Sequence, residues 1–389
     1  MGRVPGPIKA SPAELPMEDR YRYWVALLLV SGLGARSAHK LLERFGSAEH
    51  VFSASLTGIE SCGVPAQAAQ AIVQGKALEA ADRELDAVRQ LGCRLVAFDD
   101  PAYPGLLKQT YDPPVLLYLR GDAAVLNSHC LAIVGSRHPT TYGNVIAEKL
   151  ARELAGVGLT IVSGMARGID SASHRGALAA KGKTIAVFGC GMDVMYPREN
   201  KKLAEQIEAN GALVTEFPLG TFPAPQNFPI RNRVISGMSL GVMIVEAAQY
   251  SGSLITARLA MEQNREVFGV PGNITTKTSF GPNLLIKQGA KLVTSFEDVL
   301  EELPATVRAE LLPKTTTQQE AASLFEESLS ESERAVFALL KVDEARHIDE
   351  IVEAAERNSS EVLATLFQLE MRGVIRQLPG KYFIRVLEA

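Results

Sequence analysis

The sequence contains no hydrophobic segment long enough to cross a lipid bilayer. Its longest apolar run, Tyr23–Val30, falls far short of the ~20 residues that a membrane-spanning helix needs. No basic-then-apolar leader is present at the N-terminus, and a composition of 47% hydrophobic and 22% charged residues is typical of a globular protein. We therefore predict a cytoplasmic protein that has no membrane partner.

Cysteine and histidine are scarce, with four and six copies in 389 residues. The four cysteines (Cys62, Cys93, Cys130 and Cys190) form no C-x-x-C pair, and the six histidines show neither H-x-x-x-H nor H-E-x-x-H spacing. These absences argue against a disulfide framework and against the usual metal sites. We expect reduced thiols, no bound metal and no histidine-based catalytic set.

Two phosphate-binding fingerprints are incomplete. Gly189-Cys190-Gly191 lacks the third glycine of a dinucleotide-binding loop, and no acidic ribose-binding residue follows at the expected distance. Gly176–Thr184 (GALAAKGKT) resembles a Walker A loop, but it has five residues between its glycines and joins a helix to a following strand. A phosphate loop joins a strand to a following helix. We therefore predict no cofactor and no ATP hydrolysis.

The charge is unevenly distributed, although the net charge is only −4. Residues 128–302 hold 17 Lys and Arg against 15 Asp and Glu, whereas residues 303–389 hold 10 against 15. A phosphate site in the middle segment must therefore be a local pocket rather than a broad basic face. The acidic C-terminal segment is better suited to contact a protein than to grip DNA.

Composition and periodicity divide the chain into six segments. Four prolines in the first 19 residues indicate disorder, and the polar, acidic stretch around Thr315–Gln319 indicates a linker. The predicted segments are a disordered N-terminus at 1–19, a SAM-like or helix-hairpin-helix domain at 20–75, a bridge at 76–127, a Rossmann-like core at 128–302, a linker at 303–330 and a winged-helix domain at 331–389.

The N-terminal segment reads as small helices. Leu33 stands between Gly32 and Gly34 at the turn from an apolar helix into a second helix at Ala35–Phe45. A helix-hairpin-helix can present backbone N–H groups to a DNA phosphate at such a turn. A glycine-rich loop in an accessory helical domain explains the same residues, so both interpretations remain open.

The middle segment alternates continuous apolar strands with helices, a pattern typical of an α/β fold with a parallel sheet covered on both faces. The expected strands are Leu131–Val134, Leu159–Val162, Thr184–Phe188, Ala212–Thr215, Val242–Val245, Val267–Val270 and Lys291–Val293. In the C-terminal segment the expected elements of a winged helix are three helices, Glu333–Leu340, Ile348–Ala355 and Ser359–Arg372, and a hairpin of Ile375–Gln377 with Tyr382–Arg385 that turns at Pro379-Gly380.

Polar and cationic residues gather where the predicted strands end. Gly135-Ser136-Arg137 follows the first strand, and Ser251-Gly252-Ser253 opens the helix after the fifth. Helix N-termini at the carboxyl edge of such a sheet bind anions and nucleotides. Glu216 and Glu246 also end strands; they either form a pair of carboxylates in a cleft or hydrogen-bond loop N–H groups and pair with Arg231 and Arg233.

Six ordered motifs resemble the DNA-processing protein A (DprA/Smf) family. They are AIVGSR (Ala132–Arg137), SGMARGIDSASHRGAL (Ser163–Leu178), KTIAVFGCGMDVMYP (Lys183–Pro197), FPIRNRVISGMS (Phe228–Ser239), EAAQYSGSLITA (Glu246–Ala257) and VPGN (Val270–Asn273). The order of the domains also fits that family: a SAM-like head, a Rossmann-like core and a winged-helix tail.

The resemblance implies a recombination mediator that binds single-stranded DNA, protects incoming strands during natural transformation and loads the RecA recombinase. It also implies a homodimer formed through the Rossmann-like core, and a base that stacks on Phe228. The DNA-binding residues it implies are Gly135, Ser136, Arg137, Ser163, Gly164, Lys183, Phe228, Arg231, Asn232, Arg233, Ser251, Gly252 and Ser253. Relatives often carry a histidine or lysine just before Phe228, whereas this chain has Pro225, Gln226 and Asn227, which predicts a less basic pocket.

Two other classes of function compete with this interpretation. The first is a nucleotide-binding or nucleotide-cleaving enzyme of the lysine-decarboxylase-like Rossmann group, in which Glu246 and Ser251–Ser253 would act together. Its P-G-G-x-G-T-x-x-E motif is incomplete here, because Val270–Asn273 lacks the second glycine. The second is a structural adaptor between two proteins, which leaves the strand-end arginines without a role.

Overall fold

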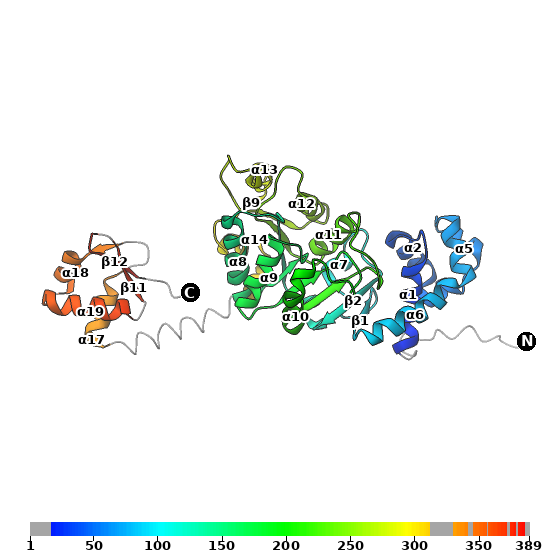
Figure 1. Ribbon diagram of the computed structural model, residues 1–389, viewed down its shortest axis with the longest axis horizontal. Coiled ribbons are helices and arrows are strands. Elements are labelled where there is room, and N and C mark those ends of the chain that lie inside the picture. The colour runs from blue at the N-terminus through cyan, green and yellow to red at the C-terminus, as the bar shows by residue number, and fades with distance from the viewer. Residues whose placement is uncertain are drawn as a thin grey trace, which may run out of the picture. The chain divides into compact units, whose positions relative to one another are not determined.

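The computed structural model describes residues 17–311, 330–340, 345–355, 357–371, 374–378 and 380–385. These residues fall into two compact units, a large one that ends at Leu311 and a small C-terminal one (Figure 1). None of the described helices is both long and apolar enough to cross a membrane.

The large unit begins with a group of helices. They are α1 (Met17–Leu29), α2 (Ala35–Phe45), α3 (Ala48–Phe52), α4 (Leu56–Glu60), α5 (Ala66–Gln74) and α6 (Lys76–Gln90). Buried Trp24 and Leu27 belong to α1, which packs along α6. Because α1 begins at Met17, the last three residues of the segment predicted to be disordered are helical; residues 1–16 lie outside the described residues. Gly32, at a φ of +77°, forms the turn before α2.

A nine-stranded sheet forms the core of the large unit, in the order β1-β2-β6-β5-β4-β3-β7-β8-β9. All seven predicted strands are present, and they pair in parallel, which confirms the Rossmann-like core. The strands are β1 (Arg94–Ala97), β2 (Leu116–Gly121), β3 (Cys130–Val134), β4 (Thr160–Ser163), β5 (Thr184–Val187), β6 (Ala212–Thr215), β7 (Gly241–Ile244), β8 (Glu266–Gly269) and β9 (Lys291–Leu292).

The core extends beyond the predicted limits of 128 and 302. The segment assigned to a bridge contains β1 and β2, an antiparallel pair that joins the sheet through β2 and β6. At the other end, α15 (Ala305–Leu311) buries Val307 and Leu311 against the core, so the chain stays in this unit for nine residues of the predicted linker. The rest of that linker lies outside the described residues.

Helices cover both faces of the sheet because its strands are apolar on both sides. Along β3, Cys130, Ala132 and Val134 face one hydrophobic cluster, while Leu131 and Ile133 face another. The first cluster includes side chains from α7 (Gly105–Lys108), α11 (Asn227–Gly237), α12 (Gly252–Glu262) and α13 (Phe280–Lys287). The second cluster includes side chains from α8 (Thr141–Gly156), α9 (Ile169–Ala179), α14 (Glu297–Glu302) and α15. Helix α10 (Lys201–Asn210) packs beside β6.

His174 on α9 is fully buried and neutral. The Thr184 hydroxyl donates to the Ile161 carbonyl at 2.7 Å, so it accepts from Nδ1–H of His174, also at 2.7 Å. Nε2 is then an unprotonated, buried acceptor with no partner among the described residues. Protonation would bury a cation without a counterion, and burial accordingly lowers the pKa of His174 to about 3.

Because His174 is buried and neutral, we predict that the folded protein loses stability in acid. Between pH 6.5 and about 3 the unfolded chain binds a proton at His174 that the folded chain does not, so the free energy of unfolding falls as the pH falls, by up to about 4 kcal/mol. Urea midpoints of the wild type and His174→Gln, measured across this range, check it. Subtracting the two curves removes the carboxylates that titrate in the same window. Parallel curves would contradict the prediction.

The small C-terminal unit is a winged helix, as predicted. Its elements are α17 (Glu331–Ala338), β10 (Arg346–His347), α18 (Ile348–Ala355), α19 (Ser359–Met371), β11 (Ile375–Leu378) and β12 (Tyr382–Arg385). The sheet order is β10-β12-β11, so a third strand, too short to show periodicity, joins the predicted hairpin. Arg372 and Pro379, where the sequence places a helix end and a turn, lie outside the described residues.

Candidate nucleic-acid interface

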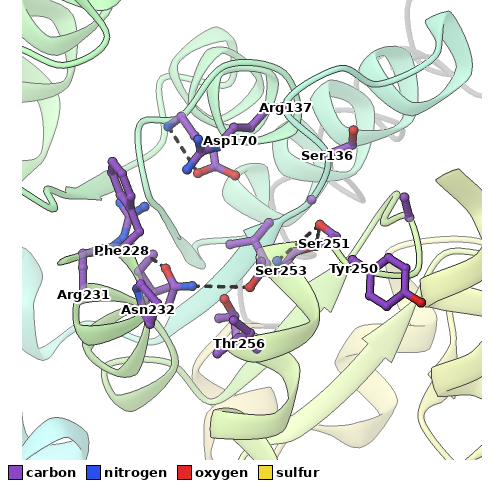
Figure 2. A pocket seen from close by; sticks show the side chains of 18 of the residues that line it. Ser136, Arg137, Asp170, Phe228, Arg231, Asn232, Tyr250, Ser251, Ser253 and Thr256 are labelled. Atoms are coloured by element: carbon purple, nitrogen blue, oxygen red, sulfur yellow. Dashed lines mark hydrogen bonds between the residues drawn. The ribbon is translucent and has the colours of Figure 1, made fainter. Parts of the chain in front are cut away.

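A cavity of about 980 Å³ opens at the carboxyl ends of β3 and β7. From β3 the chain proceeds through β4, β5 and β6 on one side of the sheet and through β7, β8 and β9 on the other, so the strand order reverses between β3 and β7. Open α/β sheets bind their ligands at this switch point. The loop after β3 and the loop after β7 both line the cavity (Figure 2).

The fold brings nine of the thirteen predicted site residues to this cavity. They are Gly135, Ser136, Arg137, Phe228, Arg231, Asn232, Ser251, Gly252 and Ser253. Gly164 lines a smaller adjoining pocket together with Arg137 and Phe228. Ser163 is buried with its hydroxyl donating to the Ile133 carbonyl at 2.7 Å, so it is part of the sheet's interior rather than of the cavity.

Lys183 is placed away from the cavity. It directly precedes β5, and its carbonyl accepts the N–H of Ile161. The cavity is at the carboxyl ends of the parallel strands, so the exposed Lys183 lies at the opposite edge of the sheet. The resemblance assigned a DNA contact to a residue that the topology separates from the other site residues.

Gly135 and Glu246 fix the loop that carries Arg137. A Cβ on Gly135 would stand 2.8 Å from the Glu246 carbonyl oxygen and 2.7 Å from Cγ1 of Ile169, so only glycine fits. The Ser136 N–H donates to that same carbonyl at 2.7 Å. The buried Glu246 carboxylate accepts the N–H and hydroxyl of Thr140, at 2.8 and 2.6 Å. Its oxygens therefore position the start of α8.

Arg231 is buried and held by the protein itself. Its Nη1 donates to the carbonyls of Gly164 and Val187, both at 2.5 Å, and Nε donates to the Asn232 side chain at 3.1 Å. Only 4% of the residue is exposed, and burial lowers the pKa of the guanidinium to about 10. The arginine that the sequence predicts as a phosphate ligand therefore ties β4 and β5 to α11.

Asp170 is the buried carboxylate near Arg231. It accepts the N–H groups of Gly164 and Ala166, at 3.1 and 3.3 Å, which shapes the loop between β4 and α9. Burial raises the pKa of this carboxyl, and the nearby Arg231 opposes the rise. The residue thus holds the loop that precedes α9.

Arg233 points away from the cavity, toward the N-terminal helices. It is 8% exposed and pairs with Glu216, while its Nε lies 3.5 Å from Oδ2 of Asp112. Burial raises the pKa of the Glu216 carboxyl even though Arg233 opposes the shift. Glu216 and Glu246 are therefore far from forming a catalytic pair: one pairs with an arginine and the other accepts loop hydrogen bonds.

Of the two arginines that line the cavity, Arg137 is the one that is free to bind a ligand. Its guanidinium forms no hydrogen bond or ion pair within the described part of the chain and lies over the Phe228 ring, 5.0 Å from the centroid. The Tyr196 ring and the Gly189 backbone also pack against Phe228. A base that stacks at this end must displace the guanidinium or stack on its plane.

Tyr250 lines the cavity and was not singled out in the sequence. It follows β7 and directly precedes Ser251, whose hydroxyl accepts the Ser253 N–H at 3.4 Å at the start of α12. An aromatic residue between a buried strand and a helix N-cap is the signal that was available. Its role is not deducible from that position alone, because aromatic residues in such loops more often pack inward.

Known proteins match both units. Residues 94–304 match the family model described as DNA recombination-mediator protein A, and residues 318–381 match the DprA winged helix domain. The chain is 38% identical to protein Smf of Escherichia coli over 92% of this chain and 94% of that protein. The chain belongs to the DNA recombination-mediator protein A family.

Two further relatives support this membership. The DNA processing protein DprA of Bacillus subtilis is 45% identical over 57% of this chain and 75% of its own length. The X-ray structure of DprA from Streptococcus pneumoniae superposes with a TM-score of 0.65 and 38% identity, covering 73% of this chain and 98% of that one. The family match begins at residue 94, the first residue of β1, which agrees with the extended core described above.

Proposed function

We propose that this recombination-mediator protein binds single-stranded DNA, without sequence preference, in the cavity between β3 and β7. The observation that carries the proposal is the state of the arginines: internal contacts hold Arg231 and Arg233, while Arg137 is exposed at the cavity and forms no ion pair within the described chain. Aromatic rings beside a free cation favour unpaired bases, whose faces are accessible for stacking.

We also propose, from the family resemblance, that the protein protects incoming strands in the cytoplasm during natural transformation and loads RecA onto them as a homodimer. The dimer proposal is supported by β9, an edge strand of the sheet whose Leu292 is 46% exposed. Sedimentation equilibrium tests the dimer, and the rate of recombinase nucleation on coated DNA tests the loading. The strand-end carboxylates are held in place, so we propose no catalytic step.

Binding titrations test the central proposal. We expect the full-length protein to bind labelled poly-dT at least ten-fold more tightly than a duplex of equal length, with an affinity that falls as salt rises, because phosphate contacts release counterions. A panel of free nucleotides in the same assay, followed by chromatography of the products, tests the enzyme alternative. Equal affinity for both DNA forms, together with binding or cleavage of a free nucleotide, would overturn the proposal.

A further inference from the structure

The cavity has a second aromatic surface that is open to solvent. The Tyr250 side chain is 93% exposed, and no hydrogen bond or ring contact joins it to any other described residue. Single exposed aromatic residues are ordinary on a convex surface. This one lines a concave site, and in Figure 2 it stands on the side of the labelled group away from Phe228.

The surroundings of Tyr250 differ from those of Arg137. Ile255 and Phe280, which are 41% and 42% exposed, line the cavity with it, as does the exposed Lys277. The segment that carries Lys277 is fastened to the Tyr250 loop: the Ala247 N–H donates to the Thr278 carbonyl at 2.6 Å, and the Ala247 carbonyl accepts the Gly281 N–H at 2.7 Å. Lys277 has no ion-pair partner within the described chain.

We infer that Tyr250 and Lys277 form a second nucleotide subsite, in which a base stacks on the Tyr250 ring and Lys277 contacts a backbone phosphate. This inference rests on the proposed binding of single-stranded DNA and extends it from one subsite to two. An aromatic face beside a cation is the combination that binds an unpaired nucleotide regardless of its base. Tyr250 offers a free face, whereas the Phe228 ring is covered by a guanidinium.

Comparing an oligonucleotide with an abasic strand distinguishes the base contact of Tyr250 from the phosphate contact of Lys277. Tyr250→Ala should weaken binding to oligo-dT about ten-fold but leave binding to an abasic strand of equal length unchanged, because only the base contacts the ring. Lys277→Ala should weaken binding to both strands and reduce the salt slope by about one. Tyr250→Phe should bind like the wild type, as should Tyr111→Ala, which removes an exposed tyrosine outside the cavity.

A spectroscopic signal tests stacking directly. The chain has one tryptophan, Trp24, which is buried in the N-terminal helices and serves as a constant background. In Tyr250→Trp, oligo-dT should quench the new fluorescence, and high salt should restore it. If Tyr250→Ala binds oligo-dT like the wild type while Arg137→Ala does not, the second subsite is wrong and the proposed function stands. If the wild type does not bind oligo-dT, the proposed function itself fails.

Discussion

Replacing Arg137 with alanine is expected to weaken binding to single-stranded DNA about 10- to 100-fold, because a charge-assisted hydrogen bond stabilises a complex by about 1.5–3 kcal/mol. The dependence of log K on log salt should also become shallower by about one unit, since one phosphate contact is lost. Fluorescence anisotropy with labelled oligo-dT at several salt concentrations measures both quantities. The folded state should be unaffected, because the guanidinium has no internal hydrogen bond among the described residues.

Lys183→Ala is the matched control, since it removes one exposed cation from the opposite edge of the sheet. It should bind oligo-dT like the wild type and keep the full salt slope. An equal loss of affinity in Lys183→Ala and Arg137→Ala would mean that DNA follows a path outside the cavity. Unchanged affinity in a folded Arg137→Ala variant would remove Arg137 from the interface.

Much of the fold was predictable because the strands of a parallel sheet are buried on both faces. β3 to β8 show as mostly buried apolar runs, whereas both residues of β9 are exposed, and each of the seven strands forms within one residue of its predicted bounds. β1 and β2 lie in the segment predicted as a bridge and were not expected in the sheet, since nothing local shows that β2 pairs with β6 across the chain. The core was predicted to end at residue 302, although it extends to Leu311. Helix α15 was missed because it comes just after the acidic residues of α14.

The site was predictable in its position but not in its chemistry. Arg137 and Arg231 are both arginines of the family motifs, and the resemblance gives them the same role. Burial distinguishes them: three internal acceptors hold the buried Arg231 guanidinium, while the exposed Arg137 lies over an aromatic ring and forms no hydrogen bond or ion pair among the described residues. Lys183 illustrates the converse, because a residue inside a family motif can lie at the wrong end of a strand. Its position directly before β5 places it at the amino edge of the parallel sheet, as the order of elements in the sequence also indicates.

Replacing Arg231 with alanine is expected to give the largest loss of stability, about 3–5 kcal/mol, even though the residue lines the cavity. The carbonyls of Gly164 and Val187 would lose their donor in the interior, and the buried Asp170 would lose its nearby cation. A urea titration followed by circular dichroism measures the change. Arg137→Ala serves as the comparison, because it also removes a cavity arginine. It should change the free energy of unfolding by less than about 0.5 kcal/mol.

The two arginine variants together decide what holds the DNA. If Arg231→Ala loses stability as predicted, any loss of binding in that variant reports a distorted cavity, and Arg137 remains the proposed direct contact. Arg231→Lys keeps the charge but lacks the Nε donor that Arg231 offers to the Asn232 side chain, so it should recover only part of the stability. A stable Arg231→Ala variant that no longer binds oligo-dT would contradict this assignment. The buried arginine would then have to leave its carbonyl partners when DNA binds, and the site described here would be the unliganded arrangement of a cavity that reorganises around the strand.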